Sequence, residues 1–438
     1  MRQVWDLTRR HGVRRAMSMV RQRLKHGPGT PLKSRNVFTH YDFVRVDRIA
    51  LAPQAPRSGT LLWFIPDFNI GSGGHQTIFR TIWHLERMGW ESAIVIVDPV
   101  VHATAESARH DICEHFFPLQ AKVFIGFDGL PNAEFVIATG WQTAYPVRAV
   151  SGPVRKLYFV QDFEPSFYPT GTESVLADNT YHFGFFGITA GGWLASKLRA
   201  EYGMRTHPIS FGVDHELYRQ RPRREPHIKR VFFYARPPTP RRAFEFGLLV
   251  LEAVSRRLPD TQFILAGWDV SDYHIPFPHL AAGVITPEEL ADVFSQCDAA
   301  LVLSLTNLSL MPLEVMAAGC AVVSNRGDCV EWLLNDEVAL LTDPTLEALS
   351  DALCQLLQDD VQRQALCRRA QEFALQQHWE ASAKAFRASW RASSGVSTPT
   401  LPKASFRVLP ALFRYCTTQV RTPDGLALSP KPLRSLSR

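Results

Sequence analysis

Residues 301–325 read LVLSLTNLSLMPLEVMAAGCAVVSN, and this stretch decides the fold. An apolar strand is followed by a polar turn, by a helix that begins near Met311–Pro312, and by a second apolar strand. Proline suits the first position of a helix, because its missing N–H would have no partner there. A strand, a turn and a helix N-terminus in succession are typical of an open α/β sheet, where ligands bind at the strand ends. The acid in the first helical turn, Glu314, is therefore a candidate binding residue, although it can also serve only to complement the helix dipole.

Two series of strands and helices surround this stretch. The first begins with an apolar strand at residues 60–66, a glycine-rich turn, a helix at 77–88 and a strand at 92–97. The second begins with VFFY at residues 231–234 and reaches the quoted stretch through further strands and helices. A length of 438 residues also favours two domains. We therefore predict an α/β protein of the GT-B architecture, in which two Rossmann-like doubly wound domains face a central cleft.

Composition and charge set the expected boundaries. We predict a basic extension at residues 1–57, an N-terminal domain at 58–212, a C-terminal domain at 213–392 and a basic tail at 393–438. The last helix, near 379–390, can cross back to the first domain.

The charge distribution is uneven. Residues 1–57 carry a net charge of +10 and residues 394–438 carry +6, which leaves −10 on the middle of the chain. A basic amphipathic helix is expected at residues 13–24. The basic ends can contact the inner face of the plasma membrane, or they can be solvated termini that lie on an acidic body. No nucleic-acid partner is indicated.

Other features indicate a cytoplasmic protein. No run approaches the roughly 20 apolar residues that a membrane span needs, and charges interrupt the N-terminus where a signal peptide would have its apolar core. The seven cysteines show no C-x-x-C spacing, which favours reduced thiols over disulfides or a zinc site.

The glycine-rich turn after the first strand is a candidate phosphate site. The amides of Gly73 and Gly74 can approach a phosphate at a helix N-terminus, and His75 can reach a donor or acceptor or be a plain hydrogen-bonding residue. Asp98 ends the next strand, as in dinucleotide-binding folds, but Gln76 stands where their motif needs glycine. A hydride-transfer enzyme is therefore disfavoured. The glycines can also simply make a tight turn.

A proline-stiffened loop after residue 234 carries two arginines suited to a diphosphate. Arg236 and Arg241 lie five residues apart, and an arginine can bind phosphate oxygens in a bidentate manner. A solvated basic loop is the alternative. Trp268 follows the next strand and can stack on a base or be a rim aromatic, and the backbone at Val284 and Ile285 offers a second place to bind a base.

Acids at the end of the strand at 156–160 are candidate acceptor-side groups. Asp162 can orient or help deprotonate an acceptor hydroxyl, with Gln161 and Glu164 beside it. A strand-end turn with a cap explains the same residues almost as well.

These motifs resemble those of family-4 glycosyltransferases. The pair Arg236-x4-Arg241 resembles the Arg-x4-Lys pair that holds the donor diphosphate, which makes both arginines candidate catalytic residues. The segment 308–314 resembles the nucleotide-binding half of the E-x7-E motif, which implies donor contacts from Ser309, Leu310 and Glu314. Thr306 stands where that motif has its first glutamate, which contacts the transferred sugar, so a common UDP-hexose donor is less expected.

The first domain resembles WsaF-type rhamnosyltransferases in FIPDFNIGSGGHQTIFR (64–80) and YFVQDFEPSFYPTGTE (158–173). The likeness runs from about residue 38 to about residue 390 and omits the basic ends. It implies retaining, metal-independent transfer of a deoxyhexose, above all L-rhamnose, from a dTDP-sugar to a surface polysaccharide, O-antigen or lipid-linked glycan. No cofactor is expected. Two alternatives stay open: a nucleotide- or glycan-binding module without turnover, and a GT-B nucleotide-sugar epimerase.

Overall fold

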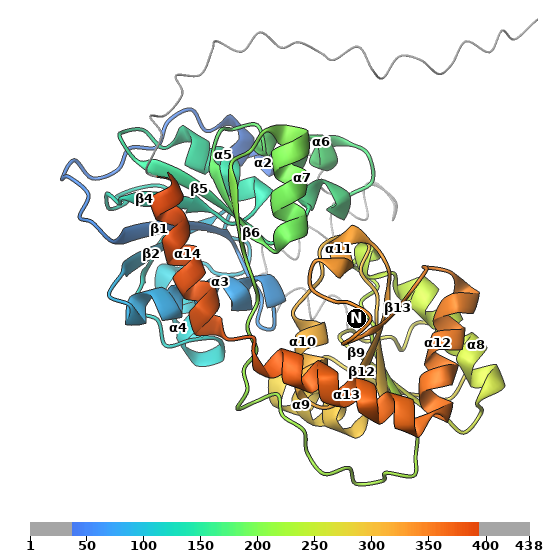
Figure 1. The fold of residues 1–438 in the computed structure, drawn as a ribbon. Helices are drawn as coiled ribbons and strands as arrows, with labels where there is room; N and C mark the ends of the chain where they lie inside the picture. The colour runs from blue at the N-terminus through green and yellow to red at the C-terminus, as the bar shows by residue number, and fades with distance from the viewer. Residues whose placement is uncertain (1–36, 394–438) are drawn as a thin grey trace, which may run out of the picture. The chain divides into compact units, whose positions relative to one another are not determined.

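A computed structural model describes residues 37–393, with side chains through residue 389. The predicted amphipathic helix at 13–24 and the basic tail beyond 393 lie outside the described residues, as does most of the predicted basic extension. Two parallel sheets organise the described chain, and helices cover both faces of each (Figure 1). The predicted α/β fold of two Rossmann-like domains is confirmed.

The first sheet has seven parallel strands in the order β3-β2-β1-β4-β5-β6-β7. Its strands are β1 (Thr60–Pro66), β2 (Glu91–Val97), β3 (Lys122–Ile125), β4 (Phe135–Ala138), β5 (Arg155–Val160), β6 (Phe186–Ala190) and β7 (Thr206–Ile209). Its helical segments are α2 (Val37–His40), η2 (Asp42–Arg45), α3 (Gly73–Arg87), α4 (Ala105–His115), α5 (Trp141–Ala149), η3 (Glu164–Phe167), α6 (Thr172–Thr180) and α7 (Gly192–Tyr202).

The second sheet has six parallel strands in the order β10-β9-β8-β11-β12-β13. Its strands are β8 (Arg230–Tyr234), β9 (Gln262–Ala266), β10 (His279–Gly283), β11 (Ala299–Val302), β12 (Ala321–Asn325) and β13 (Leu340–Thr342). The helical segments that follow β7 are η4 (Pro240–Arg242), α8 (Phe244–Arg257), α9 (Pro287–Gln296), α10 (Met311–Ala317), α11 (Asp328–Glu331), α12 (Leu346–Gln358), α13 (Asp360–Leu375) and α14 (Trp379–Ser393).

Strand β1 shows why continuous apolar runs became central strands. Its side chains alternate between two faces, so both faces must be covered. Leu61 and Trp63 pack in the core layer of α3 and α4, while Leu62 and Phe64 pack in the layer of α5, α6 and α7. All four side chains are buried. A polar residue at any of these positions would leave an unpaired group in a core.

Two chain crossings connect the domains, and they touch each other. The first follows β7, and the second enters α14. Val213 N–H donates to the Gln377 carbonyl at 3.0 Å, and His215 Nε2 contacts the same oxygen at 3.0 Å. Helix α14 lies beside α3 (Figure 1) and inserts Phe386 between Trp63 and Phe159 of the first sheet, at ring distances of 5.5 and 5.4 Å. The last helix of the chain therefore covers the first sheet.

Residues 37–57 also pack on the first domain. Phe43 makes edge-on contacts with Trp141 and Tyr145 of α5, and Ile49 forms a parallel bridge with Val150. Both described ends of the chain thus belong to the first domain.

Candidate functional site

The N-terminus of α3 is open for an anion. Ser72 stands at the N-cap, but its hydroxyl bonds to Nδ1 of His75 at 2.8 Å instead of capping the helix. A side chain added at Gly73 would meet nothing within 4 Å. Free backbone N–H groups at a helix N-terminus attract negative charge. The open space at Gly73 is compatible with the phosphate role of Gly73 and Gly74, which stays a prediction.

His75 stabilises this turn through two hydrogen bonds of its ring. Its ring is buried, with Nε2 bonded to the Pro66 carbonyl at 3.1 Å and Nδ1 bonded to Ser72. Burial lowers the pKa of His75 to about 4, against the opposing influence of the Pro66 carbonyl. The imidazole is therefore neutral near pH 7, with Nε2–H donating to Pro66 and Nδ1 accepting from Ser72. Both ring nitrogens are engaged within the protein.

Gln161 joins the glycine turn to the end of β5. Its side-chain amide Nε2 donates to the Gly74 carbonyl at 3.1 Å. This contact brings together two predicted residues that lie 87 positions apart in the chain.

Asp162 is fully engaged by protein donors. Its Oδ1 accepts from the amides of Phe163 and Asn307, both at 2.8 Å. Its Oδ2 accepts from Arg241 Nε and from the Thr306 hydroxyl, both at 3.1 Å. A carboxylate offers about four lone-pair sites. The side chain is 9% exposed, so in this arrangement it has no site left for a substrate proton.

Arg241 is held on one edge and one face. Asp162 binds its Nε, and the Phe167 ring stacks under the guanidinium at 3.8 Å. Within residues 37–389, neither terminal nitrogen of Arg241 has a protein hydrogen-bond partner. The side chain is 23% exposed. A guanidinium fixed in this way presents two N–H-bearing nitrogens outward, the geometry that suits phosphate oxygens.

Arg242 has a different role from its neighbour. Its Nη1 donates to the Ser304 hydroxyl and to the Asn307 carbonyl, the latter at 3.1 Å. Burial lowers the pKa of Arg242, although nearby Asp162 opposes this effect. Arg242 therefore fixes the turn after β11, and its Nη2 lies 3.8 Å from Oδ2 of Asp162.

Loops after β8, β9 and β10 meet around Trp268. The guanidinium of Arg236 lies 5.8 Å from the centroid of that ring, and its Nη1 donates to the Tyr234 hydroxyl at 3.3 Å. Gly267 N–H donates to the Gly283 carbonyl at 2.7 Å, which places Trp268 beside the loop that carries Val284. Trp268 is 40% exposed and Val284 is 75% exposed. Ile285 packs against the core and offers only its backbone.

Glu314 lies apart from these groups. It is in the first turn of α10, after the half-buried residues Ser309 and Leu310. Burial raises the pKa of Glu314 to about 7, although Arg80 of α3 and Tyr218 oppose the shift. Among the described residues, no hydrogen bond or ion pair joins the Glu314 side chain to the other predicted site residues, although its amide donates to the Leu310 carbonyl at 3.3 Å.

Glu164 supports the fold of the first domain. It is buried, and Oε2 accepts from the Tyr158 hydroxyl at 3.1 Å and from the Trp141 amide at the start of α5. Burial raises the pKa of Glu164 to about 8. It does not face solvent, so its predicted acceptor role would require the surrounding segment to move.

The raised pKa of Glu164 predicts a pH-dependent stability. Since the folded chain binds this proton more tightly than the unfolded chain, the stabilisation is complete below pH 4.5 and is lost as the pH rises through about 8. Glu164→Gln keeps both hydrogen bonds, because one oxygen accepts both. We expect the variant to exceed wild type by about 2 kcal/mol or more at pH 9 and to match it at pH 4. Urea unfolding at both pH values measures this.

The matched control for this prediction is Glu347→Gln, which replaces an exposed acid in the first turn of α12. Because this acid is exposed to solvent, its replacement should give no gain in stability over wild type at pH 9. A Glu164→Gln variant that loses stability at pH 9 would show that the carboxylate, not the neutral acid, is the form the fold prefers.

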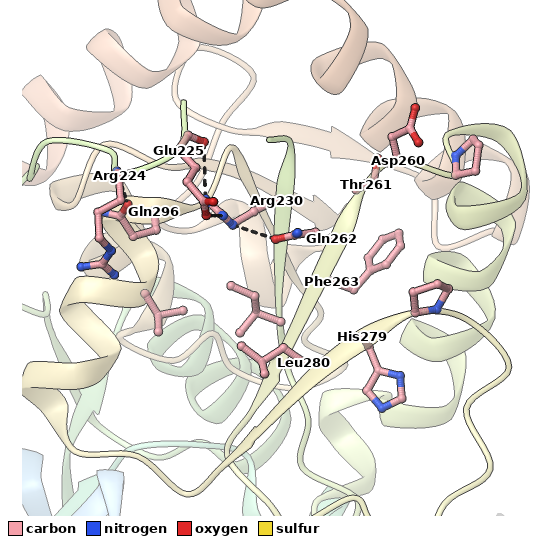
Figure 2. Close-up of a pocket in the computed structure, with 14 residues that line it drawn as sticks. Arg224, Glu225, Arg230, Asp260, Thr261, Gln262, Phe263, His279, Leu280 and Gln296 are labelled. Atoms are coloured by element: carbon pink, nitrogen blue, oxygen red, sulfur yellow. Dashed lines mark hydrogen bonds and ion pairs between the residues drawn. The ribbon is translucent and has the colours of Figure 1, made fainter. Parts of the chain in front are cut away.

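A cavity lies at the opposite end of the second sheet. It has a volume of about 580 Å³ and is lined by the first residues of β8, β9 and β10 (Figure 2). Arg230 there is bonded to Glu225 and to Gln262, and Arg224 pairs with Asp292. None of the predicted site residues lines this cavity. Because ligands in open α/β sheets bind at the carboxyl ends of the strands, we do not assign it to the donor.

Four residues around the site were not predicted. Arg80, Phe167, Arg242 and Asn307 act through contacts between segments far apart in the chain. Phe167 lies in one of the quoted motifs, but nothing in its spacing indicated an arginine partner. Among residues 37–393 there is no group of three or more His, Cys, Asp or Glu residues arranged to hold a metal ion. Within the same range, no helix has the length and apolar character needed to cross a bilayer.

Sequence comparisons relate the chain to sugar-transferring proteins. Residues 229–354 match the family model of the WsaF C-terminal domain. The O-antigen biosynthesis protein RfbC of Myxococcus xanthus is 34% identical over 337 residues, which cover 74% of this chain and 26% of that protein. D-inositol 3-phosphate glycosyltransferase of Corynebacterium urealyticum is 34% identical over 120 residues, 27% of each chain. The chain spans about a quarter of the length of the curated relatives it matches.

Solved structures with the same fold are more distant in sequence. Anabaena HepE, solved with UDP-glucose, has a TM-score of 0.58 at 18% identity and covers 76% of this chain and 99% of its own. S. aureus TarM, solved with UDP and a glycan, has a TM-score of 0.62 at 10% identity. The match covers 76% of this chain and 99% of the TarM chain. Sucrose-phosphate synthase of Thermosynechococcus elongatus has a TM-score of 0.60 at 14% identity. The match covers 77% of this chain and 99% of the synthase chain. The chain therefore has the GT-B fold of these glycosyltransferases, and its second domain matches the C-terminal domain of WsaF.

Proposed function

We propose that this chain is a glycosyltransferase of surface-polysaccharide or O-antigen synthesis that transfers a deoxyhexose, above all L-rhamnose, from a dTDP-sugar. The observation that carries the proposal is Arg241, whose edge and face are fixed while its terminal nitrogens have no hydrogen-bond partner among the described residues. The match to the WsaF C-terminal domain and the likeness to an O-antigen biosynthesis protein support it.

The proposed chemistry is a metal-independent, retaining transfer. Arg236 and Arg241 bind the leaving diphosphate, and the amides at Gly73 and Gly74 face it across the site. Such donors stabilise charge that develops in the transition state. Because every acceptor position of Asp162 is engaged, the leaving phosphate itself is the group that takes the acceptor proton.

The nucleoside and sugar occupy the remaining predicted positions. In this proposal Trp268 stacks on the base, the backbone at Val284 and Ile285 borders it, and Glu314 accepts from the 3′-hydroxyl of the deoxyribose. Thr306 replaces an acid on the sugar side, and its hydroxyl is bonded to Asp162. The acceptor is a growing surface glycan or a lipid-linked glycan. The enzyme acts in the cytoplasm, with its basic ends at the inner face of the plasma membrane.

A nucleotide series tests the donor. Thermal-shift measurements with UDP, dUDP, dTDP and GDP should show the largest stabilisation with dTDP. A ligand present at a hundredfold its dissociation constant adds about 2.7 kcal/mol of stability. The difference between UDP and dUDP isolates the 2′-hydroxyl, which Glu314 can bind only in UDP, and the difference between dUDP and dTDP isolates the 5-methyl group. Larger stabilisation by UDP than by dTDP would overturn the dTDP-sugar assignment.

Turnover separates the proposed enzyme from the two alternatives. Release of dTDP from dTDP-L-rhamnose should require a glycan acceptor. Binding without release would indicate a binding module, and a changed nucleotide sugar without acceptor, detected by mass spectrometry, would indicate an epimerase.

A further inference from the structure

The segment Asp162–Phe167 of the first domain holds an arginine of the second. Asp162 binds Arg241 at its Nε, and Phe167 stacks on the guanidinium face. We propose that Asp162 and Phe167 are positioning residues that orient Arg241 toward the donor diphosphate. This inference rests on the proposed function, and it gives Asp162 a role on the donor side instead of the acceptor side.

The two contacts leave the guanidinium little freedom. An arginine has five N–H donors in a planar fork, one on Nε and four on the terminal nitrogens. A bond at Nε prevents rotation within the plane, and a ring at 3.8 Å prevents tilting of the plane. The four N–H donors on the terminal nitrogens are then held in one orientation. An oriented fork loses less entropy when it binds a phosphate than a freely rotating side chain does.

Asp162 is itself fixed by the turn after β11. The amide of Asn307 and the hydroxyl of Thr306 donate to it at 2.8 and 3.1 Å. The Asn307 side chain is buried. Its Nδ2 donates at 2.9 Å to the carbonyl of Gln161, which follows β5, and at 2.7 Å to the carbonyl of Ala190, the last residue of β6. The carboxylate is therefore locked to both domains.

Phe167 is fixed from the other direction. It ends η3, whose first residue, Glu164, is bonded to the start of α5 and to Tyr158. The buried hydrogen bonds of Glu164 thus hold the segment on which the Phe167 ring is placed. The first domain supplies both supports of the Arg241 guanidinium.

Charge alone predicts the opposite result from positioning. Asp162 is an anion beside the proposed diphosphate site, so its removal would strengthen the binding of an anionic ligand if only charge mattered. If Asp162 positions Arg241, its removal weakens that binding. The sign of the change therefore decides between the two.

The test compares a nucleoside diphosphate with its nucleoside in the full chain. Asp162→Asn and Phe167→Leu should each weaken dTDP binding about tenfold or more, as when partners that orient metal ligands are removed. Thymidine, which has no phosphate, should bind as it does to wild type. Calorimetry measures dTDP and ligand-observed NMR measures thymidine. Phe167→Tyr, which keeps the ring, should restore dTDP affinity.

Phe163→Leu is the matched control, because this half-buried ring in the same segment stacks on Tyr181 and not on Arg241. It should leave dTDP affinity unchanged. If Asp162→Asn and Phe167→Leu bind dTDP as tightly as wild type or more tightly, the positioning role is overturned while the proposed function stands. If wild type binds neither dTDP nor UDP, the proposed function fails and this inference fails with it.

Discussion

Arg241→Ala is expected to lower sugar transfer by about 10²–10³-fold while the fold stays intact, as when one donor to a developing charge is removed. Its terminal nitrogens are free of protein partners within the described residues, so their loss affects the ligand first. Asp162 would keep its bonds to Phe163, Thr306 and Asn307, so no buried charge would be left without a partner. Initial rates of dTDP release from dTDP-L-rhamnose with a glycan acceptor measure the loss.

Two further variants sharpen this experiment. Arg241→Lys keeps the charge but not the planar fork, so it should recover only part of the rate. Arg256→Ala removes an arginine whose side chain is 78% exposed and pairs with Glu252 within α8, so it should transfer sugar at the wild-type rate. Wild-type transfer by a folded Arg241→Ala enzyme would show that Arg241 does not bind the diphosphate.

Gly212→Ala, in the first of the two chain crossings between the domains, is expected to lower the free energy of unfolding strongly. A Cβ there would lie 2.3 Å from the Trp379 amide nitrogen and 2.7 Å from the His378 carbonyl carbon. These are backbone atoms at the start of α14, so they cannot rotate away. Overpacking in a core typically costs about 1–3 kcal/mol, and a clash between two backbones belongs at the upper end. Urea unfolding should show this loss.

Gly192→Ala is the control for Gly212→Ala. This glycine begins α7, and a Cβ there would meet nothing within 4 Å. It should unfold at nearly the same urea concentration as wild type. Equal midpoints for Gly212→Ala and Gly192→Ala would mean that the two crossings can separate without cost.

The sequence predicted the central strands, because side chains buried on both faces of a sheet form continuous apolar runs. Residues 60–66 and 231–234 are continuous apolar runs and became central strands with side chains buried on both faces. Strand β10, HLAAG, was missed because it lies at the sheet edge, where its first three residues are exposed and no apolar run is needed. Helix α4 was missed because most of its residues are polar or charged, so its two buried positions, Ala108 and Ile112, do not form a visible apolar periodicity.

The candidate site was predictable as a set of residues but not as a set of contacts. Spacing within one loop indicated Arg236 and Arg241, because both lie after the same strand. The partner of Arg241 is 79 residues away, and the contact of Thr306 with the same carboxylate spans 144 residues. Local patterns carry no information on such pairs. This is why the contact between Asp162 and Arg241 was not expected from the sequence. The catalytic and binding roles of all these residues stay predictions.

The return of α14 to the first sheet makes the second domain an insertion within the first. The chain leaves the first domain after β7 and re-enters it at Trp379, through crossings that contact each other at Val213 and Gln377. A truncation after β7 would strip Phe386 from the first sheet and leave Trp63 and Phe159 facing water. An exchange of the region between the two crossings would instead preserve that core. An exchange of the second domain should therefore use cuts at both crossings and keep α14 with its own first domain.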